Sequence, residues 1–293
     1  MSFDKIKTEL LAPAGSYDAA RAAVNAGADA IYMGGPLFSA RAYAESSAEK
    51  VSGNEGGGIV NDRSIGNTEN TGDDMLLKAL DFCHLRGVKV YMTLNTLLKE
   101  REMRTLKDYL KPYMEHGLDG VIVQDLGVMK LILEKYPGTE LHVSTQAVVT
   151  GAEYAGLLMK LGAKRIVLAR ELSLEEIKRI YEETKAELEV FAHGALCYSY
   201  SGQCLMSSFI GGRSGNRGRC AGTCRLPYEV FDDCGRRMNG KNDRYVLSMK
   251  DLNTVIRLRE MIDAGVYSFK IEGRMKSPEY VAAAVSLYRK YLD

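Results

Sequence analysis

The chain has 293 residues, of which 46% are hydrophobic and 26% charged, and its formal net charge is +1. This length suits one large domain with a substantial apolar core. The balanced charge excludes a disordered tail or a uniformly basic protein that coats nucleic acid. The opening residues contain no apolar run typical of a signal peptide, and no stretch reaches the ~18 apolar residues that a membrane-spanning helix needs. We therefore expect a soluble, cytoplasmic protein.

Eight short apolar runs alternate with segments in which apolar residues recur every three or four positions. Such runs are typical of buried parallel strands, and the segments between them are typical of amphipathic helices. The runs are residues 9–12, 30–33, 88–94, 121–123, 141–144, 165–168, 188–191 and 268–271. Together they predict an α/β fold, a TIM-like (β/α)8 barrel, whose usual size is ~250 residues. A doubly wound open sheet is the alternative, but no Gly-x-Gly-x-x-Gly turn follows the first run.

Local signals mark several helix ends. Ser173 and Glu176 have the spacing of a capping box, in which each side chain accepts a hydrogen bond from the other residue's backbone N–H. Five glycines each precede a predicted strand, where a left-handed residue ends a helix at little cost. They are Gly27, Gly87, Gly117, Gly162 and Gly265.

Two segments exceed a minimal barrel. Residues 46–73 carry six Gly, four Asn and four Ser without periodicity, which predicts a polar insertion that forms a lid or lacks order. Residues 194–249 form a long Cys-rich insertion after the seventh predicted strand. We therefore expect residues 1–293 to form a single barrel domain with these two insertions. Strand-to-helix loops lie at the catalytic face of a barrel, so the second insertion should border the active site.

The Cys-rich insertion is more basic than the rest of the chain. It contains eight Lys and Arg against four Asp and Glu, a net charge of +4, which leaves −3 for the remainder. Arg219 and Arg225 flank two of its cysteines, Cys220 and Cys224. A basic patch beside a site suits an anionic substrate or an RNA backbone, although scattered charges are also common in a solvated loop.

Five of the six cysteines fall within 38 residues. They are Cys197, Cys204, Cys220, Cys224 and Cys234; the sixth, Cys83, stands in an apolar helical stretch and is expected to be a core thiol. Clustered cysteines of a reducing compartment more often bind metal or act in catalysis than form disulfides. Zinc and iron–sulfur clusters both take four thiolates, and the spacing does not choose between them. A Cys197 nucleophile paired with His193 is the non-metal alternative.

Polar residues at the carboxyl ends of the predicted strands are the candidates for chemistry, because a barrel gathers them around one mouth. They are Asp125, His142, Arg170, Glu171, His193, Glu272 and Arg274. The two histidines could transfer protons near neutral pH, or could be hydrogen-bonded structural residues. The two arginines could bind a carboxylate bidentately. Glu9, at the start of a buried strand, is expected to be a satisfied carboxylate on the barrel floor.

The stretch Glu-Val-Phe-Ala-His-Gly-Ala-Leu-Cys at residues 189–197, with Gly-Gln-Cys at 202–204 and Ser207, resembles the signature of the U-32, or collagenase-like, peptidase family. Six further motifs are similar to the rest of that family's barrel. They lie at residues 9–15, 32–35, 93–95, 124–127, 142–146 and 270–274. The resemblance thus runs nearly from end to end.

The resemblance implies more than one activity. The family label implies proteolysis, whereas some relatives are RNA hydroxylases that make 5-hydroxyuridine in tRNA with prephenate or 5-hydroxycytidine in 23S rRNA. Others are oxygen-independent ubiquinone hydroxylases that hold a 4Fe-4S cluster on four cysteines and work as heteromers. By resemblance, Cys197, Cys204 and Cys220 are cluster ligands here, with Cys224 as the fourth and Cys234 as its alternative.

These observations favour an iron–sulfur-dependent RNA base hydroxylase that acts on tRNA uridine or 23S rRNA cytidine. Its expected catalytic residues are His193, His142, Asp125 and Glu272, and its expected substrate-binding residues are Arg170, Arg274, Arg219 and Arg225. Prephenate or another small dicarboxylate is an expected co-substrate, and a protein partner or a second copy is possible. One alternative is a peptidase, which the family label alone supports. The other is a non-catalytic barrel, folded by zinc, that serves as a subunit of a hydroxylase complex.

Overall fold

The computed structural model describes residues 8–35, 37–39 and 75–293. Eight parallel strands close into a barrel, as the apolar runs predict. They are β1 (Glu9–Pro13), β2 (Ala30–Gly34), β3 (Lys89–Leu94), β4 (Gly120–Val123), β5 (Glu140–Val143), β6 (Arg165–Val167), β7 (Glu187–Gly194) and β9 (Val266–Ile271). Each strand from β1 to β7 pairs with the next, and β9 closes the barrel between β7 and β1. The TIM-barrel prediction is confirmed.

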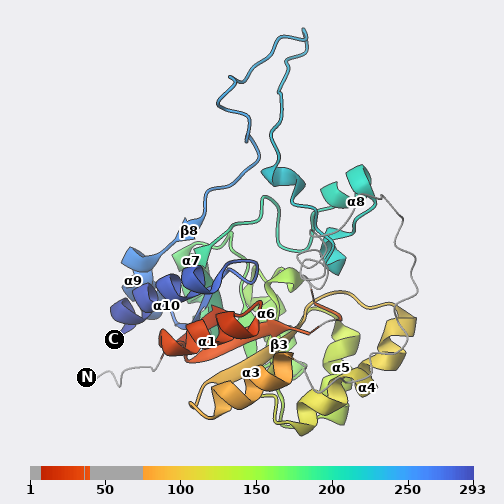
Figure 1. Cartoon of the computed structure of the whole chain (residues 1–293), viewed down its shortest axis with the longest axis vertical. Coiled ribbons are helices and arrows are strands. Elements are labelled where there is room, and N and C mark those ends of the chain that lie inside the picture. The colour runs from red at the N-terminus through yellow and green to blue at the C-terminus, as the bar shows by residue number, and fades with distance from the viewer. Residues whose placement is uncertain (1–7, 36, 40–74) are drawn as a thin grey trace.

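Helices cover the outside of this barrel (Figure 1). They are α1 (Tyr17–Asn25), α3 (Met75–His84), α4 (Glu100–Glu115), α5 (Leu126–Lys135), α6 (Ala152–Lys160), α7 (Leu174–Thr184), α9 (Leu258–Asp263) and α10 (Pro278–Leu292). Single 3-10 turns precede α6 at Thr145–Ala147 and α9 at Val255–Arg257. No helix in the described part of the chain is long and apolar enough to cross a membrane.

The predicted helix signals hold at α7 and α9. Ser173 caps α7, with its Oγ accepting from the Glu176 N–H at 3.3 Å and Glu176 Oε2 accepting from the Ser173 N–H at 2.8 Å. Gly265, at φ +95°, follows α9, and a Cβ at that position would lie 2.2 Å from Cγ of Tyr181. Only glycine therefore allows β9 to start so close to α7.

The apolar core lies between the strands and the helices, because alternate side chains of each strand point outward into that layer. The barrel interior holds a second, small apolar cluster of Leu11, Ala30, Tyr32, Tyr91 and Ile122. Cys83 belongs to the outer layer and is fully buried, which confirms it as a core thiol. Burial raises the pKa of the Cys83 thiol to about 12.

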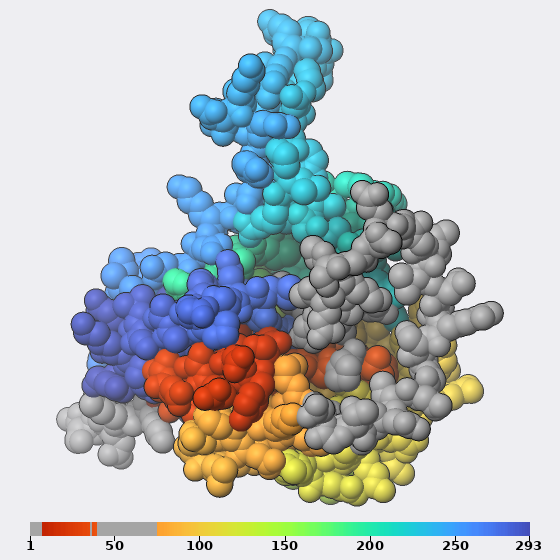
Figure 2. Space-filling view, in the orientation of Figure 1, coloured from red at the N-terminus to blue at the C-terminus, as the bar shows by residue number. Residues whose placement is uncertain are grey.

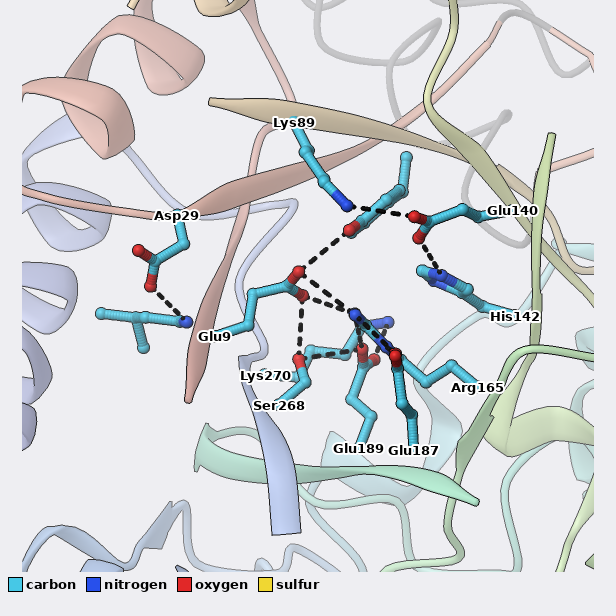
Figure 3. A network of polar contacts seen from close by, with 12 residues as sticks. Glu9, Asp29, Lys89, Glu140, His142, Arg165, Glu187, Glu189, Ser268 and Lys270 are labelled. Carbon is cyan, nitrogen blue, oxygen red and sulfur yellow. Dashed lines mark hydrogen bonds and ion pairs between the residues drawn. The ribbon is translucent and has the colours of Figure 1, made fainter. Parts of the chain in front are cut away.

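The floor of the barrel interior is ionic (Figure 3). We call this set the floor network: Glu9, Tyr91, Glu140, His142, Arg165, Glu187, Glu189, Ser268 and Lys270. At its centre the Arg165 side chain, 1% exposed, pairs with Glu9, with Glu187 at 3.3 Å and with Glu189 at 3.2 Å. Glu9 also accepts from Tyr91 Oη at 2.9 Å. The expectation that Glu9 is a satisfied carboxylate on the floor is confirmed.

The Cys-rich insertion leaves the barrel after β7 and has two parts. We call residues 194–225 the collar; it contains α8 (Met206–Gly211) and 3-10 turns at Gly215–Arg217 and Thr223–Arg225. We call residues 226–249 the arm, an extended hairpin joined by bonds such as Met238 N–H to Val230 O at 2.7 Å. The arm projects away from the barrel (Figures 1 and 2), and the chain then returns through β8 (Leu252–Asn253), antiparallel to β7. The predicted insertion at 46–73 lies outside the described residues.

Candidate active site

A cavity of about 270 Å³ lies between the carboxyl ends of the strands and the collar. The barrel wall contributes two rings, those of Tyr32 and Phe191, and the amide side chains of Asn95 and Gln146. Three thiol-bearing residues of the collar, Cys197, Cys204 and Cys220, line the same space. This is the end of a TIM barrel at which active sites are found.

Two of the predicted substrate-binding arginines reach this cavity. Arg274, 7% exposed, donates to Ser39 Oγ at 2.7 Å and to Thr93 Oγ1 at 2.8 Å. The Arg170 guanidinium lies 3.8 Å from the centre of the Phe191 ring and 3.5 Å from Glu272 Oε2. Both guanidinium groups are therefore held in fixed orientations, which is what bidentate recognition of an anion requires.

Two polar atoms near the cavity lack partners within the described residues. Arg170 Nε is buried and has no hydrogen-bond acceptor, and Oε1 of Gln146, a cavity-lining side chain, is buried and has no donor. Buried polar groups are almost always satisfied in native proteins. A ligand that offers both a hydrogen-bond acceptor and a donor would satisfy them.

Lys270 is a cavity residue that sequence analysis did not single out. Its Nζ lies 2.9 Å from Glu189 Oε1 and 4.4 Å from the centre of the Tyr32 ring. Burial lowers the pKa of the Lys270 ammonium, and the neighbouring Glu189 carboxylate opposes that shift. Lys270 thus joins the floor network to the cavity. Its signal in the sequence is that it is the one charged residue of β9, Val266–Ile271.

Glu272 is the one predicted catalytic residue that lines the cavity. It follows β9, and its side chain is 12% exposed beside Arg170. Its backbone N–H donates to His193 O at 2.8 Å, which holds the ends of β7 and β9 together. A carboxylate in this position can accept a proton from a bound substrate.

His142 lies in the floor network and does not line the cavity. Its Nε2 is 3.2 Å from Glu140 Oε2, and its ring packs edge-on against Tyr91 at 4.5 Å between centres. The side chain is fully buried, and this burial lowers the pKa of the imidazole. His142 therefore has the burial and contacts of a structural histidine.

Asp125 acts as the N-cap of α5. Its Oδ1 accepts from the N–H groups of Gly127 at 2.7 Å and Val128 at 3.2 Å, and its Oδ2 accepts from Leu98 N–H at 3.1 Å. Three backbone donors occupy this carboxylate, which does not line the cavity. Asp125 does follow the end of β4, as predicted, but its side chain caps α5 and does not point into the cavity.

A β-bulge turns His193 away from the cavity. Phe191 pairs with Lys270 and His193 pairs with Ile271, so Ala192 is an extra residue in β7. Simple alternation would place His193 on the same side as Phe191, but the bulge directs its ring to the outer layer, 5.5 Å from Tyr288 and 6.0 Å from Tyr280 of α10. Burial lowers the pKa of this imidazole, opposed by Asp251.

The two predicted collar arginines have different surroundings. Arg225 donates to Leu196 O at 2.6 Å, to Ser248 Oγ at 2.8 Å and to Met249 O, so it ties the collar to the returning end of the arm. Arg219 is exposed, and its carbonyl oxygen accepts from Arg213 Nε at 3.2 Å. Neither side chain lines the cavity.

The four predicted metal ligands gather in the collar. Burial raises the pKa of the Cys224 thiol, Arg225 opposes it, and the neighbouring Cys197, Cys220 and Cys204 raise it further. Cys220 Sγ accepts from Gly222 N–H at 3.4 Å. Within the described residues no three His, Cys, Asp or Glu side chains converge as a formed metal site. The set of four thiols nevertheless has the donor chemistry of an iron–sulfur or zinc site.

The fold and this cavity define a TIM barrel with a cationic, thiol-rimmed pocket in the usual position of an active site. The sequence profile of Peptidase family U32 matches residues 15–53 and 56–293. The chain belongs to this family, as the resemblance predicts.

Curated relatives carry names of more than one activity. The chain is 40% identical to the 23S rRNA 5-hydroxycytidine C2501 synthase of Escherichia coli (strain K12), over 100% of this chain and 40% of that protein. It is 34% identical to tRNA hydroxylation protein P1 of Bacillus subtilis (strain 168), over 98% of this chain and 63% of the relative. A collagenase of Porphyromonas gingivalis is also 34% identical, over 97% of this chain and 65% of that protein. The chain thus spans 40–65% of the length of these relatives.

Among solved structures, the U32 peptidase Mk0906 superposes with a TM-score of 0.51 at 16% identity, over 91% of this chain and 93% of that one. At this identity the likeness concerns the fold alone, and it agrees with the TIM barrel.

Proposed function

We propose that this chain is the catalytic barrel of an RNA hydroxylase that adds a hydroxyl group at C5 of a pyrimidine in rRNA or tRNA. The observation that carries the proposal is the cavity, in which Arg170, Lys270 and Arg274 surround two aromatic rings beneath a thiol-bearing collar. The names of the relatives support the same chemistry, because two of these names specify a hydroxylated base in rRNA or the hydroxylation of tRNA.

The size of the cavity is that of a small-ligand site. Its volume of about 270 Å³ is near the lower end of the ~300–1,000 Å³ typical of small-molecule sites. Enzymes that modify a base take it out of the stack into such a pocket. The Tyr32 and Phe191 rings offer apolar surface to the base, and the unpartnered Oε1 of Gln146 can accept a hydrogen bond from its edge.

Arg170 and Arg274 are the proposed sites for a small dicarboxylate such as prephenate. Each guanidinium lies at the cavity wall and is fixed by neighbouring side chains. Two such groups can each bind one carboxylate. Glu272, beside Arg170, is the proposed proton acceptor of the site.

Cys197, Cys204, Cys220 and Cys224 are the proposed ligands of a 4Fe-4S cluster, with zinc as the alternative metal. Cys224 stands in the collar with the other three thiols, which supports this set over one that contains Cys234, a residue of the arm. Such a cluster, when bound, supplies one-electron redox chemistry. The basic collar then presents the cavity to an anionic polymer.

The peptidase alternative has less support. A Cys–His pair needs the two side chains within hydrogen-bond reach. His193 instead packs on α10, on the outer side of β7, whereas Cys197 lines the cavity.

Nucleoside mass spectrometry tests the proposal directly. Deletion of the gene should remove 5-hydroxycytidine from rRNA or 5-hydroxyuridine from tRNA, and expression of the wild-type protein should restore it. Cys197→Ala should not restore it. Anaerobically purified protein should contain about four irons and four sulfides per chain, as a single cluster on four thiolates requires. An unchanged nucleoside profile, together with cleavage of gelatin by metal-depleted protein, would replace the proposal with the peptidase.

A further inference from the structure

The 3-10 turn Gly215–Arg217 of the collar lies against the loop that joins β3 to α4. We propose that Arg217 is a positioning residue, which holds the collar over the cavity through its contacts with Glu102 and Leu97. The inference rests on the proposed function, because it assigns a residue that keeps the collar thiols at the site where that chemistry takes place.

The Arg217 guanidinium makes two hydrogen bonds to one short segment of the barrel. Its Nη1 donates to Leu97 O at 2.9 Å, and its Nη2 donates to Glu102 Oε1 at 2.7 Å. The Arg217 side chain is 30% exposed and that of Glu102 13%, so water screens this ion pair less than it screens a fully exposed one. A planar guanidinium with two acceptors at fixed positions sets both the distance and the orientation of the turn.

Glu102 is itself fixed by the end of α4. It is the third residue of that helix, and its Oε2 accepts from the Lys99 N–H at 2.6 Å, as in a capping box. One carboxylate oxygen therefore holds the start of α4 while the other binds Arg217. Burial would raise the pKa of Glu102, but the hydrogen bonds from Lys99 and Arg217 hold this pKa below its ordinary value. Arg217 thus binds an ionised carboxylate that a helix end keeps in place.

The turn that carries Arg217 forms part of the cavity wall. Gly215 and Gly218 line the cavity, as does Cys220 two residues further on. A Cβ at Gly215 would lie 3.5 Å from Cys204 O and 3.7 Å from Cys220 Cβ. The turn therefore packs against two thiol-bearing residues, and a displacement of the turn would displace them as well.

The barrel side of the contact also borders the cavity. Thr93 and Asn95, at the end of β3, line the cavity, and the segment that Arg217 binds begins two residues after Asn95. Arg217 therefore joins the barrel wall of the cavity to its collar wall. The Arg225 side chain, by contrast, bonds within the Cys-rich insertion, to the collar and to the arm.

Hydrogen–deuterium exchange of the anaerobically purified full chain, followed by mass spectrometry, tests the inference. In Arg217→Gln and in Glu102→Gln, the amide groups of residues 204–220 should exchange about 10-fold faster than in the wild type, because a charged hydrogen bond that closes the collar is lost. A glutamine at position 102 can still accept from the Lys99 N–H, so α4 keeps its cap. The double variant should exchange no faster than either single variant, since both changes remove the same contact.

Arg237→Gln is the matched control. It breaks the ion pair between Arg237 and Glu229 of the arm, in which the arginine side chain is 31% exposed, and it should leave exchange in the collar at the wild-type rate. The barrel strands should keep wild-type exchange in every variant. This pattern separates a displaced collar from a protein that has lost its fold.

Two further measurements separate positioning from the ordering of a loop. Arg217→Gln should release iron to a chelator faster than the wild type, and it should restore less hydroxylated nucleoside in cells that lack the gene. Arg217→Lys keeps the charge but loses the second hydrogen bond, so it should regain part of both properties.

The outcomes are distinguishable. Wild-type exchange of the collar in both Arg217→Gln and Glu102→Gln would overturn the inference, whether or not the RNA is hydroxylated. Faster exchange together with wild-type iron retention and hydroxylation would also overturn it, because the contact would then order a loop without positioning the site. Faster exchange and iron loss in the variants, when deletion of the gene leaves the nucleosides of the cell unchanged, would support the role of Arg217 and contradict the hydroxylase.

Discussion

The two ends of the barrel interior are both charged, but they use charge differently. On the floor, the Arg165 side chain is 1% exposed and three carboxylates surround it. At the mouth, Arg170 and Arg274 lie against hydroxyl groups, rings and Glu272, beside about 270 Å³ of open space. Mutually neutralised charges hold strands together, whereas cations that border a cavity are placed to bind an anion. Lys270 contacts both regions.

The largest effect is expected on the floor. Arg165→Met should destabilise the protein by about 3–5 kcal/mol, because it leaves Glu9 buried without its cation and Glu189 with Lys270 alone. Urea unfolding followed by circular dichroism measures this change. Arg257→Ala, which breaks the exposed pair with Glu260, is the matched control and should cost less than about 1 kcal/mol. Equal losses in the two variants would mean that the floor network does not hold the barrel.

At the mouth, substitution should affect activity more than stability. Arg274→Lys keeps the positive charge but loses the planar guanidinium that can bind a carboxylate with two hydrogen bonds. Each charged hydrogen bond contributes about 1.5–3 kcal/mol. The rate of RNA hydroxylation should therefore fall roughly 100-fold. Nucleoside mass spectrometry of RNA from complemented cells measures the product. Arg170→Lys should act in the same direction. If either variant were fully active but unfolded at a lower temperature than the wild type, its arginine would have a structural role, like Arg165 on the floor.

The floor should also make the protein sensitive to acid. Burial lowers the pKa of His142, and hydrogen bonding from His142 and two lysines holds the pKa of Glu140 well below its usual range. Both groups therefore bind protons more readily in the unfolded chain than in the folded one. Stability should fall as pH drops below about 6.5, the unfolded value for histidine, and fall further below about 4.5 for Glu140.

A series of melting temperatures from pH 8 to 4 measures this dependence. His142→Asn should flatten the part between pH 7 and 5, although it lowers stability at neutral pH. An unaltered slope in that window would show that His142 does not titrate differently in the two states.

The sequence predicted the barrel well because its strands are buried on both faces, which makes each one a short apolar run. It also placed the Cys-rich insertion correctly, since that depended only on counting strands. The orientation of His193 could not be predicted, because the bulge at Ala192 arises from the pairing of β7 with β9, far away in sequence. The burial of His142 in the floor network and the position of Lys270 at the cavity depend on how the barrel closes, which the sequence pattern does not show. For the same reason the sequence did not indicate the ion-pair partners of Arg165, which come from β1 and β7.

The smallest perturbation, alkylation of single thiols, compares a thiol of the apolar layer with those of the collar and the arm. Cys83, fully buried with a pKa near 12, should stay unmodified by iodoacetamide at pH 8, whereas Cys234, exposed in the arm, should react. In anaerobically purified protein the four collar thiols should be protected, and chelation should expose them, as mass spectrometry of peptides would record. Protection of Cys234 in place of Cys224 would move the fourth ligand into the arm. Reaction of all five thiols before chelation would contradict a metal site in the collar, and would leave Cys197 as a free thiol at the cavity.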